Sequence, residues 1–526
     1  MSKRSIIYPL LLLGFLVFSL SSCQTNDQIK TSLASQLPLC EEPVTLTCLV
    51  NPSEDLLNLC DGDLNNSPFF QELEKRTNVH IEWITSIGEL QSQYAFNQSS
   101  TPTPDLVQNY YLNNSYGTAL DAGVDNGSIL NLTELIPKYA PNYYQIVQES
   151  DLDSIVYTNS GRLAAVYSIR QTPQGPWGGL QIRKDWLDEL GMDIPVTYED
   201  WETVLTAFKE KKGATAPLWI PSSGCMMDNS LSAGFQVTSD FFHIGDTVYY
   251  GPAQKGWKEY LTLLRRWYEK GLIDPNFMTG NSLYPEKDMI ESGAIGAWFH
   301  MYTMPSTFSF AEGSDQAEVV AVAPPKVHVQ DEGHIRMQDS YVDSYFTITS
   351  SCKHPDIALR WMDYLFSEEG ALLANYGLEG ETYTLDEEGH PAYTEYMTQN
   401  PDGLTFSEAI MSFTYPPGLP SFYVDWQREC QSLPHKDVSM CDIWAQSNDD
   451  YLLPTGINFT PEENTRFSAI LARLQPYVWE QTVSFITGVS SLEKDYAPYL
   501  EKLKELGLDE AEQILQTAYR RYLEKQ

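Results

Sequence analysis

The chain has 526 residues, of which 42% are hydrophobic and 20% charged, a globular composition. Because a single core stops growing at ~250–300 residues, we expect at least two lobes. The chain carries 71 acidic residues against 33 Lys and Arg, and the resulting net charge of −38 excludes the basic surface that a nucleic-acid-binding protein needs.

The N-terminus has the pattern of a secretion signal. Lys3 and Arg4 precede an apolar run at 6–20, and Leu20, Ser21 and Ser22 then lead to Cys23. This run of 15 residues is shorter than the ~20 that a membrane-spanning helix needs. We therefore interpret residues 1–22 as a signal peptide and expect residues 23–42, which are polar and aperiodic, to form a flexible tether.

The residues before Cys23 resemble the site at which bacterial lipoprotein precursors are cut. That resemblance implies that Cys23 is acylated and becomes the new N-terminus, which anchors the protein to the outer face of the cell membrane. An ordinary signal peptide with a chance cysteine is the alternative interpretation.

Order is predicted to begin with a strand at 44–50. A helix ending at 73–76 and a second strand at 79–84 follow, and a third strand is predicted at 105–107. The succession of strand, helix and strand is typical of a parallel α/β sheet.

The middle and the C-terminal part predict helices with apolar stripes. Helices are expected at 184–190, after the capping residue Thr197, before Gly271, after 354–355 and from Thr460 onward. Strands are expected at 317–323 and 341–350. Large residues repeat at i, i+3, i+4 and i+7, and we assign them to the core; they include Trp201, Val204, Leu205, Phe208, Trp257, Tyr260, Leu261, Leu264, Tyr268, Phe467 and Ile470.

Seven cysteines remain besides Cys23, and an odd number cannot all pair within one chain. They show no zinc-ligand spacing, so we expect most to be buried thiols. The sequence does not decide whether Cys430 and Cys441 form a disulfide. We predict neither a cofactor nor a bound metal.

Seven segments in the expected order resemble one family, the extracellular solute-binding lipoproteins of bacterial carbohydrate ABC importers (family 1 type), and its subgroup for oligosaccharides. They are residues 182–191, 267–275, 292–298, 361–370, 376–383, 459–463 and 485–488. Many relatives carry an Asp-, Asn- and Gly-rich loop after the helix that ends here at 208–210. In this chain residues 211–217 replace that loop and lack its composition, so the resemblance does not imply a calcium site here.

The resemblance implies an α/β fold of the two-lobed periplasmic-binding-protein type (type II), with discontinuous lobes, a hinge and a ligand cleft between them. We expect lobe I at 43–175 and 299–348, and lobe II at 176–298 and 349–526. The implied partners are a carbohydrate and the transmembrane subunits of an ABC permease, which recognise the closed form of a monomeric protein.

Sugar recognition needs flat apolar faces and polar groups for the hydroxyls, so we looked for such side chains off the helical stripes and near the expected crossovers. The candidates are Trp177, Tyr302, Trp298, His300, Tyr110, Trp219, Asp228, Tyr341, Asp343, Tyr376 and Glu379, of which Trp177 and Tyr302 fit best.

Two alternatives remain. The same fold could bind peptides or act as a sensor co-receptor. A secreted glycoside hydrolase or lyase would need two carboxylates ~5–10 Å apart, but so many carboxylates make that pattern uninformative. The chain shows no Gly-x-Ser-x-Gly, His-Glu-x-x-His or P-loop motif, which disfavours an enzyme.

Overall fold

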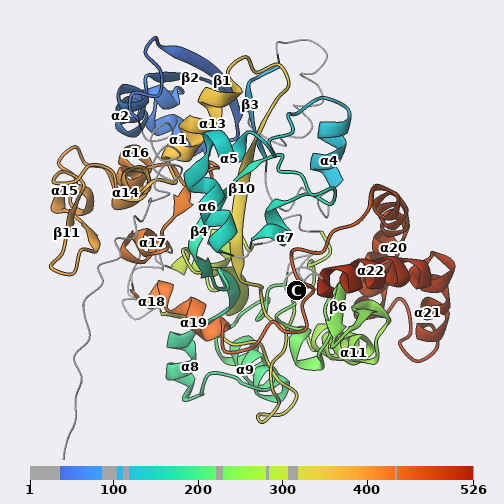
Figure 1. The fold of residues 1–526 in the computed structure, drawn as a ribbon. Helices are drawn as coiled ribbons and strands as arrows, with labels where there is room; N and C mark the ends of the chain where they lie inside the picture. The colour runs from blue at the N-terminus through green and yellow to red at the C-terminus, as the bar shows by residue number, and fades with distance from the viewer. Residues whose placement is uncertain are drawn as a thin grey trace, which may run out of the picture.

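The computed structural model describes residues 36–85, 103–109, 118–150, 152–220, 229–279, 284–305, 308, 318–432 and 435–524. A six-stranded sheet lies in the upper half of Figure 1, with α8, α9 and α11 below it and α20–α22 to one side. Within the described part of the chain, no helix is both long and apolar enough to cross a membrane.

The six-stranded sheet has the order β13-β4-β10-β3-β1-β2. The strands predicted at 44–50 and 79–84 are confirmed as β1 and β2, which pair in parallel from Val44 opposite Val79. β10 runs antiparallel between β3 and β4. The strands are β1 (Val44–Val50), β2 (Val79–Thr85), β3 (Leu106–Asn109), β4 (Val166–Gln174), β10 (Ser340–Ile348) and β13 (Tyr423–Val424).

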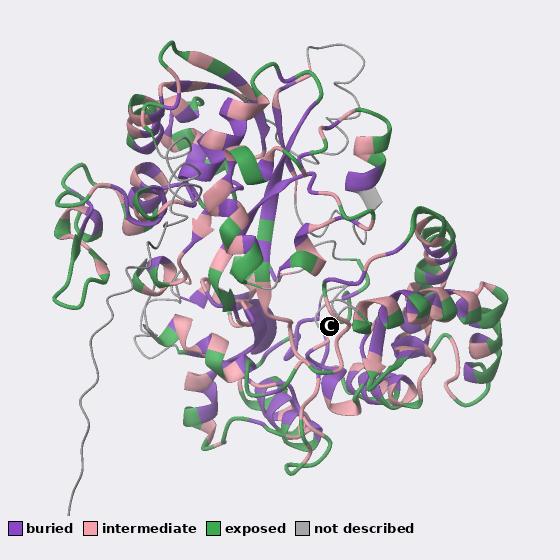
Figure 2. Ribbon diagram, in the orientation of Figure 1, coloured by how far each residue is buried: buried purple, intermediate pink, exposed green. Residues whose placement is uncertain are grey.

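Helices bury apolar faces against this sheet and form the first core, which we call lobe I. Trp361 and Met362 of α13 belong to it together with Leu46 of β1 and Leu73 of α2. Figure 2 shows these inward faces as buried. The helices are α1 (Glu54–Leu59), α2 (Pro68–Thr77), α4 (Thr118–Asp125), α5 (Ile136–Tyr139), α6 (Pro141–Glu149), α7 (Asp153–Val156), α13 (Pro355–Tyr364), α14 (Glu368–Tyr376) and α16 (Phe406–Phe413). A hairpin of β11 (Tyr383–Leu385) and β12 (Pro391–Tyr393) precedes α15 (Glu395–Thr398).

The second core, lobe II, surrounds a three-stranded sheet with the order β8-β5-β9. Its strands are β5 (Gly178–Arg183), β8 (Ala297–Met301) and β9 (Val319–Val322), and a separate hairpin joins β6 (Phe241–Ile244) to β7 (Thr247–Tyr250). Its helices are α8 (Lys184–Leu190), α9 (Tyr198–Lys211), α11 (Lys255–Glu269), α12 (Lys287–Glu291), α20 (Pro461–Thr487), α21 (Tyr496–Glu505) and α22 (Leu508–Leu523).

The predicted helix starts and stripes of lobe II are confirmed. Thr197 and Asp200 form a capping box at the start of α9, and Thr460 and Glu463 form another at the start of α20. The stripe residues of α9 and α11 are buried, except for Tyr268, which is half-buried. The local pattern of apolar residues was therefore sufficient to orient these helices.

The chain passes between the two cores three times. Residues 175–177 link β4 to β5, residues 323–339 link β9 to β10, and residues 425–439 link β13 to α19 (Met440–Trp444), which packs on β5 and β9. Two short helices, α17 (Gln427–Ser432) and α18 (His435–Val438), lie on this last crossover.

The chain is divided between the lobes differently from the expected boundaries. Residues 297–301 and 319–322 pair with β5 in lobe II, and residues 355–424 belong to the core of lobe I. The reason is that strand pairing and helix packing over long sequence separations decide which core a segment joins, and local periodicity carries no such information.

All six cysteines of the described part carry free thiols, namely Cys40, Cys48, Cys60, Cys352, Cys430 and Cys441. The structure therefore does not contain the disulfide between Cys430 and Cys441 that the sequence left open.

Candidate functional site

A third, smaller group of apolar side chains lies where the crossovers meet lobe II. We call it the joint cluster; its buried members include Trp219, Trp298, Tyr302 and Trp444, and Trp177, Phe308 and Trp426 pack against it. Four of the predicted site residues, Trp177, Trp219, Trp298 and Tyr302, thus come together at one place.

Trp177 lies on the first crossover, directly between β4 and β5. Its side chain is half-buried, and its carbonyl oxygen accepts a hydrogen bond of 3.1 Å from the backbone N–H of Tyr302. This bond ties the first crossover to the end of β8. An aromatic ring on irregular backbone between two lobes can offer a face to a ligand, and the ligand contact of Trp177 stays a prediction.

Close packing of α19 on β5 holds the joint cluster together. The indole Nε1 of Trp444 donates a 3.0 Å hydrogen bond to the carbonyl of Leu180. A Cβ atom at Gly179 would lie 2.5 Å from the Trp444 ring, so only glycine leaves room for it. Gly179, in strand β5, is therefore the position at which the sequence permits the close approach of α19.

Tyr302 follows β8 and links lobe II to the last crossover. Its side chain is 3% exposed, and its hydroxyl donates a hydrogen bond to the carboxylate of Glu429 in α17. The Trp426 ring packs edge-on at 5.5 Å between centroids. Burial, and then the adjacent Glu429 carboxylate, raise the pKa of Tyr302 far above its usual range, so the phenol stays a donor.

The sequence interpretation missed Trp426 and Glu429. Trp426 meets the criterion that identified Trp177, since it is an aromatic residue off any helical stripe and close to a proline-rich run, with Pro416, Pro417 and Pro420 just before it. The criterion was applied only near the expected crossovers, and this crossover was not expected here.

His300, on β8, is buried and stacks on Tyr284, with 4.4 Å between ring centroids. Burial lowers the pKa of His300 to about 4, so the imidazole is neutral at pH 7. Its Nδ1 accepts a hydrogen bond of 2.9 Å from the backbone N–H of Met301, which leaves the ring proton on Nε2. His300 is therefore available as a neutral donor or as a packing group, but not as a cation.

Trp298 and Trp219 are structural members of the joint cluster in this state of the protein. Trp298 is fully buried, and its Nε1 donates a 3.1 Å hydrogen bond to Oε1 of Gln181. Trp219 is 7% exposed, and its backbone N–H donates to Ala297 at 3.0 Å.

The remaining candidates lie apart from the joint cluster or outside the described residues. Tyr376 is buried in lobe I and donates to Asp425 at 2.7 Å, whereas Glu379 is exposed beside α14. Asp343 is paired with Arg170 at 3.1 Å. Tyr341 is 42% exposed and lines a separate cavity between the lobes. Cys23, Tyr110 and Asp228 lie outside the described part of the chain.

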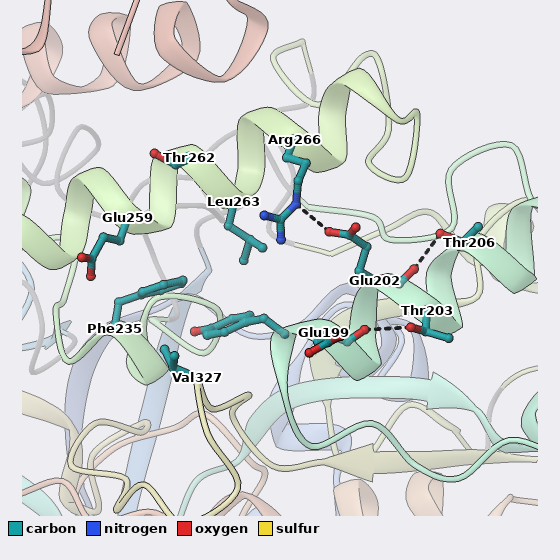
Figure 3. A pocket seen from close by; sticks show the side chains of 11 residues that line it. Glu199, Glu202, Thr203, Thr206, Phe235, Glu259, Thr262, Leu263, Arg266 and Val327 are labelled. Atoms are coloured by element: carbon teal, nitrogen blue, oxygen red, sulfur yellow. Dashed lines mark hydrogen bonds and ion pairs between the residues drawn. The ribbon is translucent and has the colours of Figure 1, made fainter. Parts of the chain in front are cut away.

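A cavity of about 790 Å³ lies in lobe II between α9 and α11 (Figure 3), and none of its lining residues belongs to the joint cluster. Tyr198 and Phe235 stack at 4.5 Å along one wall. Glu202 accepts hydrogen bonds from Arg266 at 2.7 Å and from the indole of Trp267 at 3.0 Å. Because these groups pair with one another across the two helices, we assign them to helix packing.

Two lobes, three crossovers and aromatic side chains gathered at their junction are the arrangement of a two-lobed binding protein. The model of the bacterial extracellular solute-binding proteins matches residues 66–372, more than half of the chain. The chain belongs to this family.

Two curated proteins are similar over most of the chain. The fructooligosaccharide ABC transporter substrate-binding protein FusA of Streptococcus pneumoniae serotype 4 is 22% identical over 499 residues, 88% of each chain. The lipoprotein LipO of Bacillus subtilis is 23% identical over 391 residues, 71% of this chain and 75% of LipO.

Among solved structures, the alginate-binding protein AlgQ2 is similar with a TM-score of 0.72 and 22% identity, over 91% of this chain and 99% of AlgQ2. At this identity the likeness establishes the fold, namely two-lobed α/β, as the resemblance of the sequence to the family implied.

Proposed function

We propose that this protein captures an oligosaccharide between its lobes and delivers it to the permease of an ABC importer. It does so as a monomer tethered by lipid on Cys23 to the outer face of the cell membrane. The observation that carries the proposal is the meeting of Trp177, Tyr302 and Trp426 at the junction of the crossovers.

The chemistry of these side chains suits a sugar. Indole and phenol rings offer flat faces to the C–H side of a pyranose or furanose ring. The half-buried carboxylate of Glu429, beside Tyr302, provides acceptor oxygens for hydroxyls. The names of FusA and AlgQ2 describe carbohydrate binding, which supports the same ligand class here.

Hinge closure explains how binding is signalled to a permease. Trp177 and Trp426 lie on crossovers, whereas Tyr302 belongs to lobe II. A ligand that contacts both lobes gains affinity in the closed arrangement only, so it shifts the equilibrium toward that state. The permease would then distinguish loaded from empty protein by shape.

A thermal-shift screen tests the ligand class. The mature protein is melted with fructooligosaccharides, maltooligosaccharides, alginate oligosaccharides and, as the competing class, short peptides. A ligand at 100 times its Kd raises the free energy of unfolding by ~2.7 kcal/mol. Stabilisation by peptides alone would refute the proposal, and release of shortened sugars during incubation would indicate an enzyme instead.

A further inference from the structure

A second cavity, of about 690 Å³, lies between the lobes and apart from the joint cluster. We call it the rear cavity. In Figure 1, α17 and α19 lie to one side of β4 and β10, whereas α7 and the end of α22 lie to the other side. The rear cavity is lined from α7, from the segment before α20 and from Tyr522 of α22, so it lies on the α7 side.

Each lobe contributes one wall of the rear cavity. Leu152, Ile155 and Tyr157 pack in the core of lobe I, whereas Tyr522 packs against the core of lobe II. The lobes touch at its edge, where Asn458 Nδ2 donates to the carbonyl of Ser154 at 3.3 Å.

The residues that line the rear cavity are of the types found in carbohydrate-binding sites. Three tyrosines face the same cavity from separate elements, Tyr157 after α7, Tyr341 on β10 and Tyr522 on α22. Around them stand neutral hydrogen-bonding side chains, namely Ser150, Ser154, Thr158, Asn159, Gln338, Thr455 and Asn458. Aromatic faces surrounded by hydroxyl and amide groups form the usual carbohydrate site.

The charges on the lining restrict the class of sugar. Among the described residues that line the rear cavity, Asp153 is the one carboxylate and no side chain is basic. A uronate or a sulfated sugar would meet a like charge without a compensating cation, whereas a neutral sugar would meet only hydrogen-bonding groups. The volume lies within the ~300–1,000 Å³ of small-molecule sites.

We propose that the rear cavity is a second binding site, for a neutral oligosaccharide of about three rings. Because its walls belong to different lobes, rotation about the crossovers changes the distance between them. Binding in the rear cavity is therefore coupled to binding at the joint cluster, and the coupling is reciprocal. This inference extends beyond the proposed function and does not require the same sugar at both sites.

The test isolates the rear cavity in the variant Trp177→Ala/Trp426→Ala, which lacks two rings at the joint cluster. The probes are 1-kestose, maltotriose and cellotriose, titrated calorimetrically to millimolar concentration. We expect at least one to bind this variant. Adding Tyr341→Ala should weaken that binding at least about tenfold, whereas Tyr341→Phe, which keeps the ring, should weaken it less than about threefold.

Absence of binding by all three probes overturns the proposal, as does an affinity that Tyr341→Ala leaves unchanged. If the double Trp variant does not fold, the two Tyr341 substitutions are titrated in the otherwise unchanged chain. Loss of one of two binding events then supports the second site, and an unaltered single event overturns it. Binding by the unchanged chain with none in the double variant would leave the proposed function standing and refute the rear site alone.

Discussion

The hydroxyl of Tyr302 and the carboxylate of Glu429 are joined by a hydrogen bond across 127 positions of the sequence. Tyr302 follows the β8 strand of lobe II, and Glu429 lies in α17 on the last crossover. Four residues earlier, at the start of the same crossover, Asp425 accepts from Tyr376 of lobe I at 2.7 Å. Two tyrosine–carboxylate pairs therefore fix this crossover to both lobes, with Trp426 between them.

Tyr302→Phe should weaken oligosaccharide binding and loosen the last crossover. The substitution removes the hydroxyl and leaves the Glu429 carboxylate without this donor, at a cost of about 1–3 kcal/mol. Affinity is measured by titration and the crossover by hydrogen exchange of α17. Tyr376→Phe is the matched control on the lobe I side, since it should destabilise the apo protein with a smaller effect on affinity. Equal affinity losses in both variants would contradict a special role for Tyr302.

Trp177→Ala should weaken binding at least tenfold, which corresponds to ~1.4 kcal/mol. The side chain is half-buried on a crossover, so the melting temperature of the ligand-free protein should change by only a few degrees. Trp201→Ala is the control, because Trp201 is fully buried in lobe II and its truncation should cost ~3–5 kcal/mol. A loss of apo stability in Trp177→Ala as large as in Trp201→Ala would make Trp177 structural.

Gly179→Ala should destabilise the joint cluster. Its new methyl group would lie 2.5 Å from the Trp444 indole, and relieving that overlap costs about 1–3 kcal/mol of stability. Gly175→Ala is a close control, since a Cβ there meets no atom within 4 Å. Thermal melts compare the two. A control as unstable as Gly179→Ala would mean that the contact with Trp444 does not matter.

The buried carboxyl of Asp363 should make stability fall as the pH rises. Burial raises its pKa to about 7, although it accepts hydrogen bonds from Asn142 at 2.8 Å and from the Tyr143 N–H at 2.9 Å. The folded state thus keeps a proton that the unfolded state, with a pKa of ~3.9, has lost. This contribution is fully present below about pH 4 and disappears as the pH approaches 7.

The size of this effect is a few kcal/mol, because each pKa unit corresponds to ~1.4 kcal/mol. Denaturant unfolding between pH 4 and 8 measures it in the unchanged chain and in Asp363→Asn, which cannot ionise. We expect a shallower pH dependence for the variant over this range. Identical slopes would show that Asp363 does not retain its proton.

Cys23→Ala should abolish lipid attachment and move the protein from the membrane fraction to the medium or to an uncleaved precursor. The expectation follows from the apolar run at 6–20 and the small residues before Cys23. Metabolic labelling with palmitate measures acylation. Continued labelling of this variant would exclude Cys23 as the lipidated residue.

The sequence was informative wherever structure depends on neighbours along the chain. The strands β1 and β2, the helix starts at Thr197 and Thr460, and the apolar stripes of α9 and α11 were all predicted. Arg183 and Asp185, two positions apart, likewise form a local pair at 2.8 Å. Trp177 could be chosen as a candidate ligand contact because the glycine and proline residues around it exclude a helix.

The tertiary structure alone decided which aromatic residues lie at the junction and which are core. Trp298 and Tyr302 stand close together in the sequence, yet Trp298 bonds to Gln181 within the lobe II sheet while Tyr302 bonds to Glu429 on a crossover. Local patterns determined the elements because periodicity and capping act within a few residues. The crossovers, the Tyr302–Glu429 pair and the rear cavity depend on contacts between distant segments, and only the packing of the whole chain brings those segments together.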